Sequence, residues 1–369
     1  MKFAGERLGG GKLLAAGVAV LMGVGLLTRS EDLAYGIVQG LRVSGGILIP
    51  SLFPFMILCT YLVLTDAARV LSVPLRPLTK YLLRLPPEHG TVVFASLIGG
   101  YPVGAKMISG LLERGKLDKP TAERMMAFCF NGSPAFIITA VGAGILLDRR
   151  VGVALFGAQI MASFGVGVIL SFKAPRIQAS RAKTRNEGGA QVFVSAVISS
   201  SSAMLNVCAF ATIFSGLLFM IRGIGFPLWL AELLRLDSGL ADAFISGFFE
   251  VTAGCMSSAK FGGETAIVLV SIFCSWGGLS SIFQVIALFG ETKLRWRLFF
   301  VARALHCVLA AVLSLVLYRA FLGEVSVMMH GAAPVMARGG NHWLTAACLL
   351  AMCAMLTISP TGKAYRIDR

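Results

Sequence analysis

Charged side chains are scarce in this sequence. Asp, Glu, Lys and Arg together make up 14% of the 369 residues, whereas hydrophobic residues make up 56% and the mean hydropathy is +0.80. In soluble domains about a quarter of the residues are charged, so this composition excludes an ordinary soluble fold. Several apolar runs reach the roughly 20 residues that a helix needs to cross a bilayer. The sequence therefore predicts an all-α polytopic membrane protein.

Acidic residues are fewer than basic ones, at 18 against 33, and the net charge is +15. Such a charge can indicate nucleic-acid binding, but the sequence has no RNA-binding motif and no sustained basic helix. The basic residues instead collect in short loops between apolar runs, which is typical of cytoplasmic loops in membrane proteins. We therefore expect a lipid bilayer as the partner and no nucleic acid.

Motifs of enzymes and of metal sites are missing. The chain has no G-x-S-x-G, no H-E-x-x-H and no Walker-type loop, and most of its acidic residues lie in predicted loops. The eight cysteines all fall in apolar segments and form no C-x-x-C pair. Buried cysteines of this kind are usually small apolar side chains rather than metal ligands or disulfides. We expect no enzyme activity and no cofactor.

The apolar runs and basic loops divide the chain into five parts. The first run follows basic residues and precedes no small-residue cleavage site, so we expect a retained helix with a cytoplasmic N-terminus. A basic tail predicts a cytoplasmic C-terminus as well. The parts are an N-terminal transmembrane helix at 1–33, a first repeat at 34–172, a basic cytoplasmic loop at 173–190, a second repeat at 191–297, and C-terminal transmembrane helices with a basic tail at 298–369.

Glycine and proline interrupt four of the apolar segments. Such residues free backbone N–H and C=O groups, which lipid cannot satisfy, so a break is tolerated only where protein or a water-filled cavity covers it. Interrupted segments are also the best indication from sequence of a transporter-like binding site. The breaks lie at Gly99–Lys106, Phe130–Pro134, Gly247–Thr252 and Ser275–Ser280.

The charge pattern predicts two re-entrant hairpins. If Thr91–Leu112 crossed the membrane fully, the basic loops before and after it would lie on opposite faces, which the charge rule disfavours. We therefore expect this segment, and Leu240–Ser258 from the other side, to enter the bilayer and return. Each hairpin follows a span and then an amphipathic piece. The first span lies within Ala34–Leu64, and the two amphipathic pieces are Val70–Leu85 and Ile224–Leu236. This order predicts two inverted-topology repeats with broken transmembrane helices; the alternative is a generic likeness between membrane helices rich in Gly and Ser.

Charged residues at the breaks are the first candidates for a site, because an intramembrane charge usually faces a partner or a wet cavity. Lys106 and Glu250 could form an ion pair, or Glu250 could bind a coupling cation. In the alternative, Lys106 reaches the interface and Glu250 lies near a helix end. Arg303 and His306 lie one turn apart in a later run, where we expect a packed, hydrogen-bonded His rather than a proton relay.

Small polar residues at the breaks are the second group. They could hold a polar solute or Na⁺, with the N-termini of half-helices favouring anionic groups. In the alternative they only satisfy backbone groups that the glycines free. With Lys106 and Glu250, the candidates are Gly100, Tyr101, Pro102, Asn131, Ser133, Thr252, Trp276, Ser280 and Gln284.

These motifs resemble those of the YlbJ-type sporulation integral membrane proteins. The resemblance rests on Gly100–Lys106 and Phe128–Ile138, with Pro50–Phe55, Phe249–Gly254 and Gly277–Ser280 in the same order. The resemblance implies that the chain contains the Gate domain, also called the nucleoside-recognition domain. It further implies kinship with concentrative nucleoside transporters and ferrous-iron transporters, and a location in a bacterial cell membrane. The sequence departs from the pattern at two places: Ala-Gly-Cys follows Thr252, and Phe-Asn-Gly opens the break at Phe130–Pro134.

Three functions follow as hypotheses. In the first, two inverted Gate repeats bind or move a small polar, nucleoside-like solute or a cation (Na⁺ or H⁺) near the membrane midplane. In the second, the protein is a non-transporting membrane scaffold needed for the spore envelope. In the third, it is a metal-ion permease that uses Cys129, Cys255 and Cys274.

Overall fold

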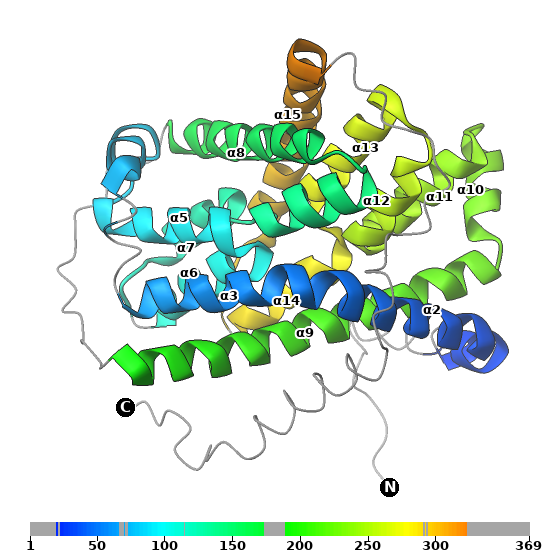
Figure 1. The fold of residues 1–369 in the computed structure, drawn as a ribbon, viewed down its shortest axis with the longest axis horizontal. Helices are drawn as coiled ribbons and strands as arrows, with labels where there is room; N and C mark the ends of the chain where they lie inside the picture. The colour runs from blue at the N-terminus through cyan, green and yellow to red at the C-terminus, as the bar shows by residue number, and fades with distance from the viewer. Residues whose placement is uncertain are drawn as a thin grey trace, which may run out of the picture.

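The computed structural model describes residues 20, 23–65, 70, 73–113, 115–172, 189–290, 292 and 294–322. The predicted basic loop and the tail, and most of the predicted N-terminal helix, lie outside these residues. The regular elements within them are all helical (Figure 1). They are α2 (Ser30–Val43), η1 (Ser44–Leu48), α3 (Ile49–Leu64), η2 (Val73–Leu75), η3 (Leu78–Leu82), η4 (Pro87–His89), α5 (Gly90–Gly99), α6 (Tyr101–Glu113), α7 (Lys119–Phe128), η5 (Ala135–Ile145), α8 (Arg149–Ser171), α9 (Gly189–Gly223), α10 (Phe226–Leu234), α11 (Ser238–Phe249), α12 (Val251–Ala259), α13 (Gly263–Trp276), α14 (Gly278–Phe289) and α15 (Trp296–Leu322).

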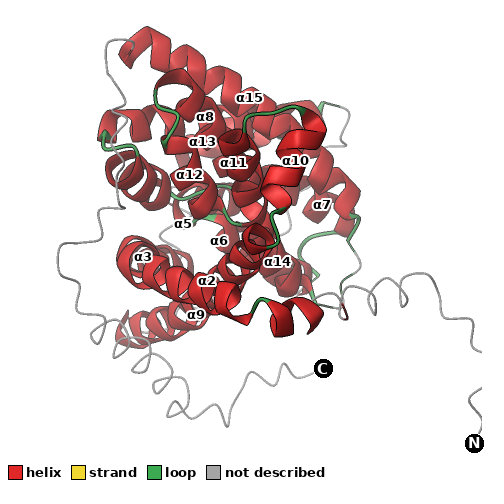
Figure 2. Ribbon diagram, turned by 90° about the vertical axis from the view of Figure 1, so that its right-hand side faces the viewer, coloured by secondary structure: helices red, strands yellow, loops and turns green. Residues whose placement is uncertain are grey.

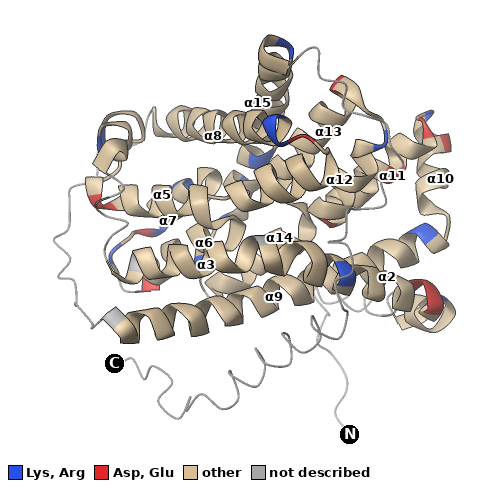
Figure 3. Cartoon of the chain, in the orientation of Figure 1, with Lys and Arg blue, Asp and Glu red and all other residues tan. Residues whose placement is uncertain are grey.

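Four helical stretches are long and apolar enough to cross a membrane: Arg149–Ser171, Ala190–Gly223, Gly263–Phe289 and Trp296–Leu322. Charged residues are rare along the middle of α3, α8 and α9 (Figure 3). The prediction of a polytopic α-helical membrane protein is confirmed.

The helices break where glycine and proline predicted breaks. Arms α5 and α6 meet at Gly100, and arms α11 and α12 meet at Glu250. Segment 129–134 separates α7 from η5, and Gly277, with φ +84°, separates α13 from α14. The arms α5 and α6 pack together, and so do the arms α11 and α12. Glycine allows this approach, because a Cβ on Gly254 would lie 2.2 Å from the Cα of Gly247.

The two halves pack on each other reciprocally. Arm α6 packs against α14, and the corresponding arm α12 packs against η5. Likewise α7 packs against α15 and α13 against α8, while α8 and α15 pack together. If a two-fold axis relates the halves, each helix must pack against the counterpart of its own partner's position in the other half, as these pairs do. The opposite membrane orientation of the two repeats stays a prediction.

Two predicted elements differ from the structure. Within Ala34–Leu64 we expected one span, but Ser30–Leu48 and Leu52–Leu62 form two arms bent by 57°. The bend lies at Pro50, which lacks the N–H that a continuous helix needs. The second difference concerns Val70–Leu85, which was predicted as an amphipathic piece: its described residues form the short turns η2 and η3, and its Leu83 is fully buried. Pro74 lies within η2 and Pro77 directly before η3, and neither offers a backbone N–H to a regular α-helix.

The helices form two parts. Helices α2 and α3, with η1, pack along α9 and form an outer layer, which Figure 2 shows as a separate group. The remaining long helices, α5–α8 and α11–α15 with η5, form the helical body. The layer meets the body where α3 packs on α5 and η5, and where α9 packs on α11 and α14.

Candidate functional site

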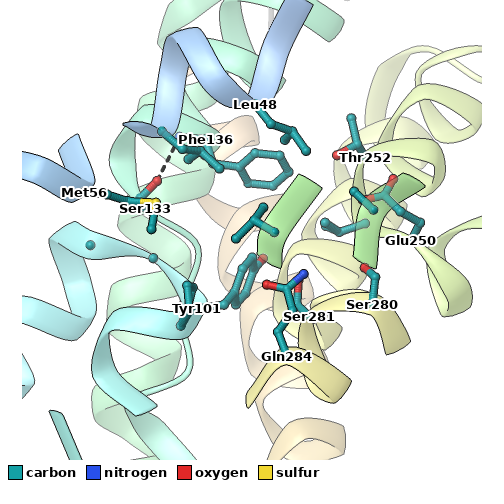
Figure 4. A pocket seen from close by; sticks show the side chains of 17 residues that line it. Leu48, Met56, Tyr101, Ser133, Phe136, Glu250, Thr252, Ser280, Ser281 and Gln284 are labelled. Atoms are coloured by element: carbon teal, nitrogen blue, oxygen red, sulfur yellow. Dashed lines mark hydrogen bonds between the residues drawn. The ribbon is translucent and has the colours of Figure 1, made fainter. Parts of the chain in front are cut away.

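A cavity of about 40 Å³ lies where the outer layer meets the helical body (Figure 4). This volume has room for a few water molecules or a small ionic group. The outer layer provides an apolar wall: Leu48, Leu52, Met56, Val207 and Ala211. The helical body provides all of the polar side chains in the lining: Tyr101, Ser133, Glu250, Thr252, Ser280, Ser281 and Gln284.

All four breaks contribute to this cavity. The structure brings eight of the eleven candidates into its lining: Gly100, Tyr101, Pro102, Ser133, Glu250, Thr252, Ser280 and Gln284. They come from segments far apart in the chain, so the tertiary fold gathers them. The remaining candidates, Lys106, Asn131 and Trp276, are not part of the lining. A function for any of these residues stays a prediction.

The ion pair between Lys106 and Glu250 is not formed. Lys106 points to the outer layer, where its Nζ donates a hydrogen bond to Oγ of Ser199 on α9. Glu250 is 5% exposed, and its carboxylate accepts the backbone N–H of Ala253 at 2.6 Å. Glu250 thus caps the N-terminus of α12, which is the helix-end position that the alternative expected.

Asn131 and Trp276 satisfy freed backbone groups. The Asn131 amide donates to the carbonyl of Phe128 at 2.9 Å. The Trp276 indole donates to the carbonyl of Phe248 at 3.1 Å and stacks on the Phe248 ring. Both side chains donate to carbonyls at the ends of interrupted helices, which is the structural role that the alternative hypothesis expected. Ser133 combines the two roles, because its Oγ accepts the N–H of Phe136 at 3.1 Å and also lines the cavity (Figure 4).

Four helices begin at or beside the cavity, namely α6, η5, α12 and α14. A helix N-terminus carries a partial positive charge from its unpaired N–H groups. Glu250 is the one charged side chain among the described residues that line the cavity. The site therefore combines a single carboxylate with several N–H and hydroxyl groups, which suits a solute that both donates and accepts hydrogen bonds.

Arg303 and His306, which the sequence singled out, belong to a buried polar network whose other members the sequence did not predict. Its centre is Arg303 on α15, which is 0% exposed. His306 is equally buried and contacts both Arg303, at 3.0 Å, and the carbonyl of Gln159, at 3.1 Å. His306 is thus the packed, hydrogen-bonded residue expected from the sequence. A charged residue inside an apolar run was the signal that pointed to Arg303.

The three cysteines of the permease hypothesis do not come together as a metal site. Sγ of Cys255 and Sγ of Cys274 lie 3.8 Å apart. Over the described residues, no group of three or more His, Cys, Asp and Glu side chains is placed to hold a metal ion. Cys129 is a free, buried thiol directly before the break at Phe130–Pro134.

The membrane-length helices and their fold define a polytopic α-helical membrane protein. The chain is similar to the sporulation integral membrane protein YlbJ of Bacillus subtilis (strain 168), with 28% identity over 316 residues, which cover 76% of each chain. The resemblance to YlbJ-type proteins is thereby confirmed. No protein-family model matches the chain, and no solved structure matches it. The kinship with Gate-domain transporters stays a prediction.

Proposed function

We propose that this protein resembles a secondary transporter and binds a small polar solute in the cavity at the four breaks. The observation that carries the proposal is the convergence of breaks from both halves on one polar cavity. Irregular backbone is costly in a membrane unless it lines a site, so four breaks at one place favour a functional role over a purely structural one.

The two walls suggest the chemistry of the solute. Glu250 and the hydroxyl and amide groups of the body would bind a solute rich in donors and acceptors. Phe136 and the apolar residues of the outer layer would contact a flat, less polar part. A nucleoside-like compound has both parts. Because the cavity as observed has room for only a few water molecules, its binding requires the outer layer to move away from the helical body. Similarity to a sporulation protein supports a role in sporulation for this chain too.

The arrangement in two parts favours movement as well as binding. All polar lining residues belong to the helical body, whereas the outer layer offers apolar contacts across the cavity. Apolar contacts are non-directional, so the contacts at the cavity itself allow one part to shift on the other. The polar contacts outside the cavity, Lys106–Ser199 and Arg222–Asp242, would have to open in such a movement. A transporter needs such an interface to expose its site to either side in turn.

A ligand screen with the purified protein tests the proposal. We expect a nucleoside to raise the melting temperature, because a ligand at 100 times its Kd stabilises the folded state by about 2.7 kcal/mol. The Glu250→Gln variant should lose most of this shift but keep its ligand-free stability, since Gln can still accept the Ala253 N–H. Na⁺ and divalent metals are screened in parallel.

Glu264→Gln is the matched control. Glu264 pairs with Arg319 on the surface, so its replacement should leave the ligand shift intact. Saturable uptake into proteoliposomes then separates a carrier from a protein that only binds. If no compound gives a shift or uptake, the proposal is wrong and the non-transporting scaffold is favoured. A shift with divalent metals alone, lost on replacing Cys255 and Cys274 with Ser, would favour the metal permease.

A further inference from the structure

Arg303 lies where two interrupted helices end. Its guanidinium donates to the carbonyl of Ala127, at the end of α7. It also donates to the carbonyl of Phe130 at 2.7 Å, in the break that follows α7. It also donates to the carbonyl of Ser275 at 3.2 Å, in the last turn of α13. One side chain from α15 thus joins the C-terminal ends of both broken helices.

These helix ends carry the negative charge that balances the guanidinium. The last carbonyls of a helix lack intrahelical donors, and the helix dipole makes that end partially negative. Within the part of the chain that the structure describes, no carboxylate forms an ion pair with Arg303. The rings of Phe130 and Phe299 cover the guanidinium, with centroids 5.2 and 5.6 Å from its central carbon. A fully buried charge would be costly without such compensation.

The neighbouring histidine adds no second charge. A guanidinium can only donate hydrogen bonds, so Nδ1 of His306 must accept from Arg303. The proton of the neutral ring then lies on Nε2, which donates to the carbonyl of Gln159. His306 is therefore a neutral hydrogen-bond acceptor that orients Arg303, and the cluster carries one positive charge.

Three backbone carbonyls converging on a buried point resemble the oxygen ligands that hold alkali or alkaline-earth cations. We propose that Arg303 is a tethered cation that occupies this position permanently. It fixes the two broken helices so that η5 and α14 begin at the cavity, and it leaves no place for a coupling cation at the helix ends. This inference rests on the proposed function and deepens it, because it excludes one cation site from the transport cycle.

Chemical rescue tests the tethered cation. The Arg303→Ala variant opens a space lined by the same carbonyls and rings, which free guanidinium can fill. We expect the variant to melt several degrees below the wild-type full chain. Guanidinium chloride in the low millimolar range should recover much of this loss, whereas tetramethylammonium chloride at equal ionic strength should not. Wild-type protein should respond to neither salt.

Two further variants keep the test decisive if Arg303→Ala does not fold. Arg303→Lys keeps the charge and Arg303→Met keeps similar bulk without it, so the Lys variant should melt at the higher temperature. Equal melting temperatures of the two variants, or an equal response of Arg303→Ala and wild type to guanidinium, would overturn the proposal. The readout is the melting temperature without solute. A negative result in these experiments therefore does not contradict solute binding in the cavity, and a lack of solute binding does not contradict the role of Arg303 as a tethered cation.

Discussion

The hydroxyl of Tyr101 donates a hydrogen bond to the backbone carbonyl of Cys274 at 2.6 Å, across 173 residues of sequence. Tyr101 begins the second arm of the first hairpin, and Cys274 lies in the last turn of α13. Carbonyls in a last helical turn need a donor from elsewhere. The bond therefore joins the hairpin of one half to the broken helix of the other, at the edge of the cavity.

Replacing Tyr101 with Phe should remove this donor and leave the carbonyl unsatisfied. A buried group that loses its partner costs about 1–3 kcal/mol, so the melting temperature should fall. Solute binding should weaken too, because α6 begins at the cavity. Tyr81→Phe is the control, since Tyr81 is 63% exposed. Equal melting temperatures for the two variants would mean that the bond contributes nothing to stability.

The close approach of α11 and α12 depends on glycine. Gly254→Ala should destabilise the protein by about 1–3 kcal/mol, because its Cβ would lie 2.2 Å from the Cα of Gly247 and the arms would have to separate. Gly110→Ala is the matched control in α6, where nothing lies within 4 Å of the added Cβ. That change should instead stabilise by about 0.5–1 kcal/mol through helix propensity. Thermal unfolding of both variants checks the opposite signs.

Filling the cavity from its apolar wall should block binding without touching a polar residue. Ala211 on α9 lines the cavity and is 5% exposed, so Ala211→Phe should place a ring in the solute's space. We expect the Kd of the solute to rise more than about tenfold, which corresponds to about 1.4 kcal/mol. Ala209→Phe, on the exposed side of the same helix, should leave the Kd unchanged. Similar affinities for the two variants would place the solute elsewhere.

A bidentate ion pair connects the outer layer to the second hairpin. Arg222 on α9 donates to both carboxylate oxygens of Asp242 on α11, at 2.6 and 2.7 Å, and both side chains are about one-quarter exposed. A double-mutant cycle should give a coupling energy of about 1–2 kcal/mol. The exposed pair Arg319–Glu264 should give at most about 0.5 kcal/mol in the same assay. If the two coupling energies are alike, Arg222 does not hold the layer to the hairpin.

Local composition was enough to predict the breaks. The stretches at Gly99–Pro102 and Gly277–Gly278 favour a break, because glycine adopts the positive φ observed at Gly100 and Gly277 and proline lacks a backbone N–H. The same reasoning placed most of the polar residues of the cavity, because they lie at or beside these breaks. It failed for Lys106, since the direction of its side chain depends on where α9 lies.

The sequence by itself determined the class of protein and the positions of the interruptions, since hydropathy, charge and backbone conformation are properties of short stretches. Only the tertiary structure decided that Glu250 caps a helix, that α9 closes the cavity, and that Arg303 joins two helix ends. Each of these depends on contacts between distant segments; Arg303 and Phe130, for example, are 173 residues apart. A buried charge selects its partners by geometry, and that geometry exists only after the helices have packed.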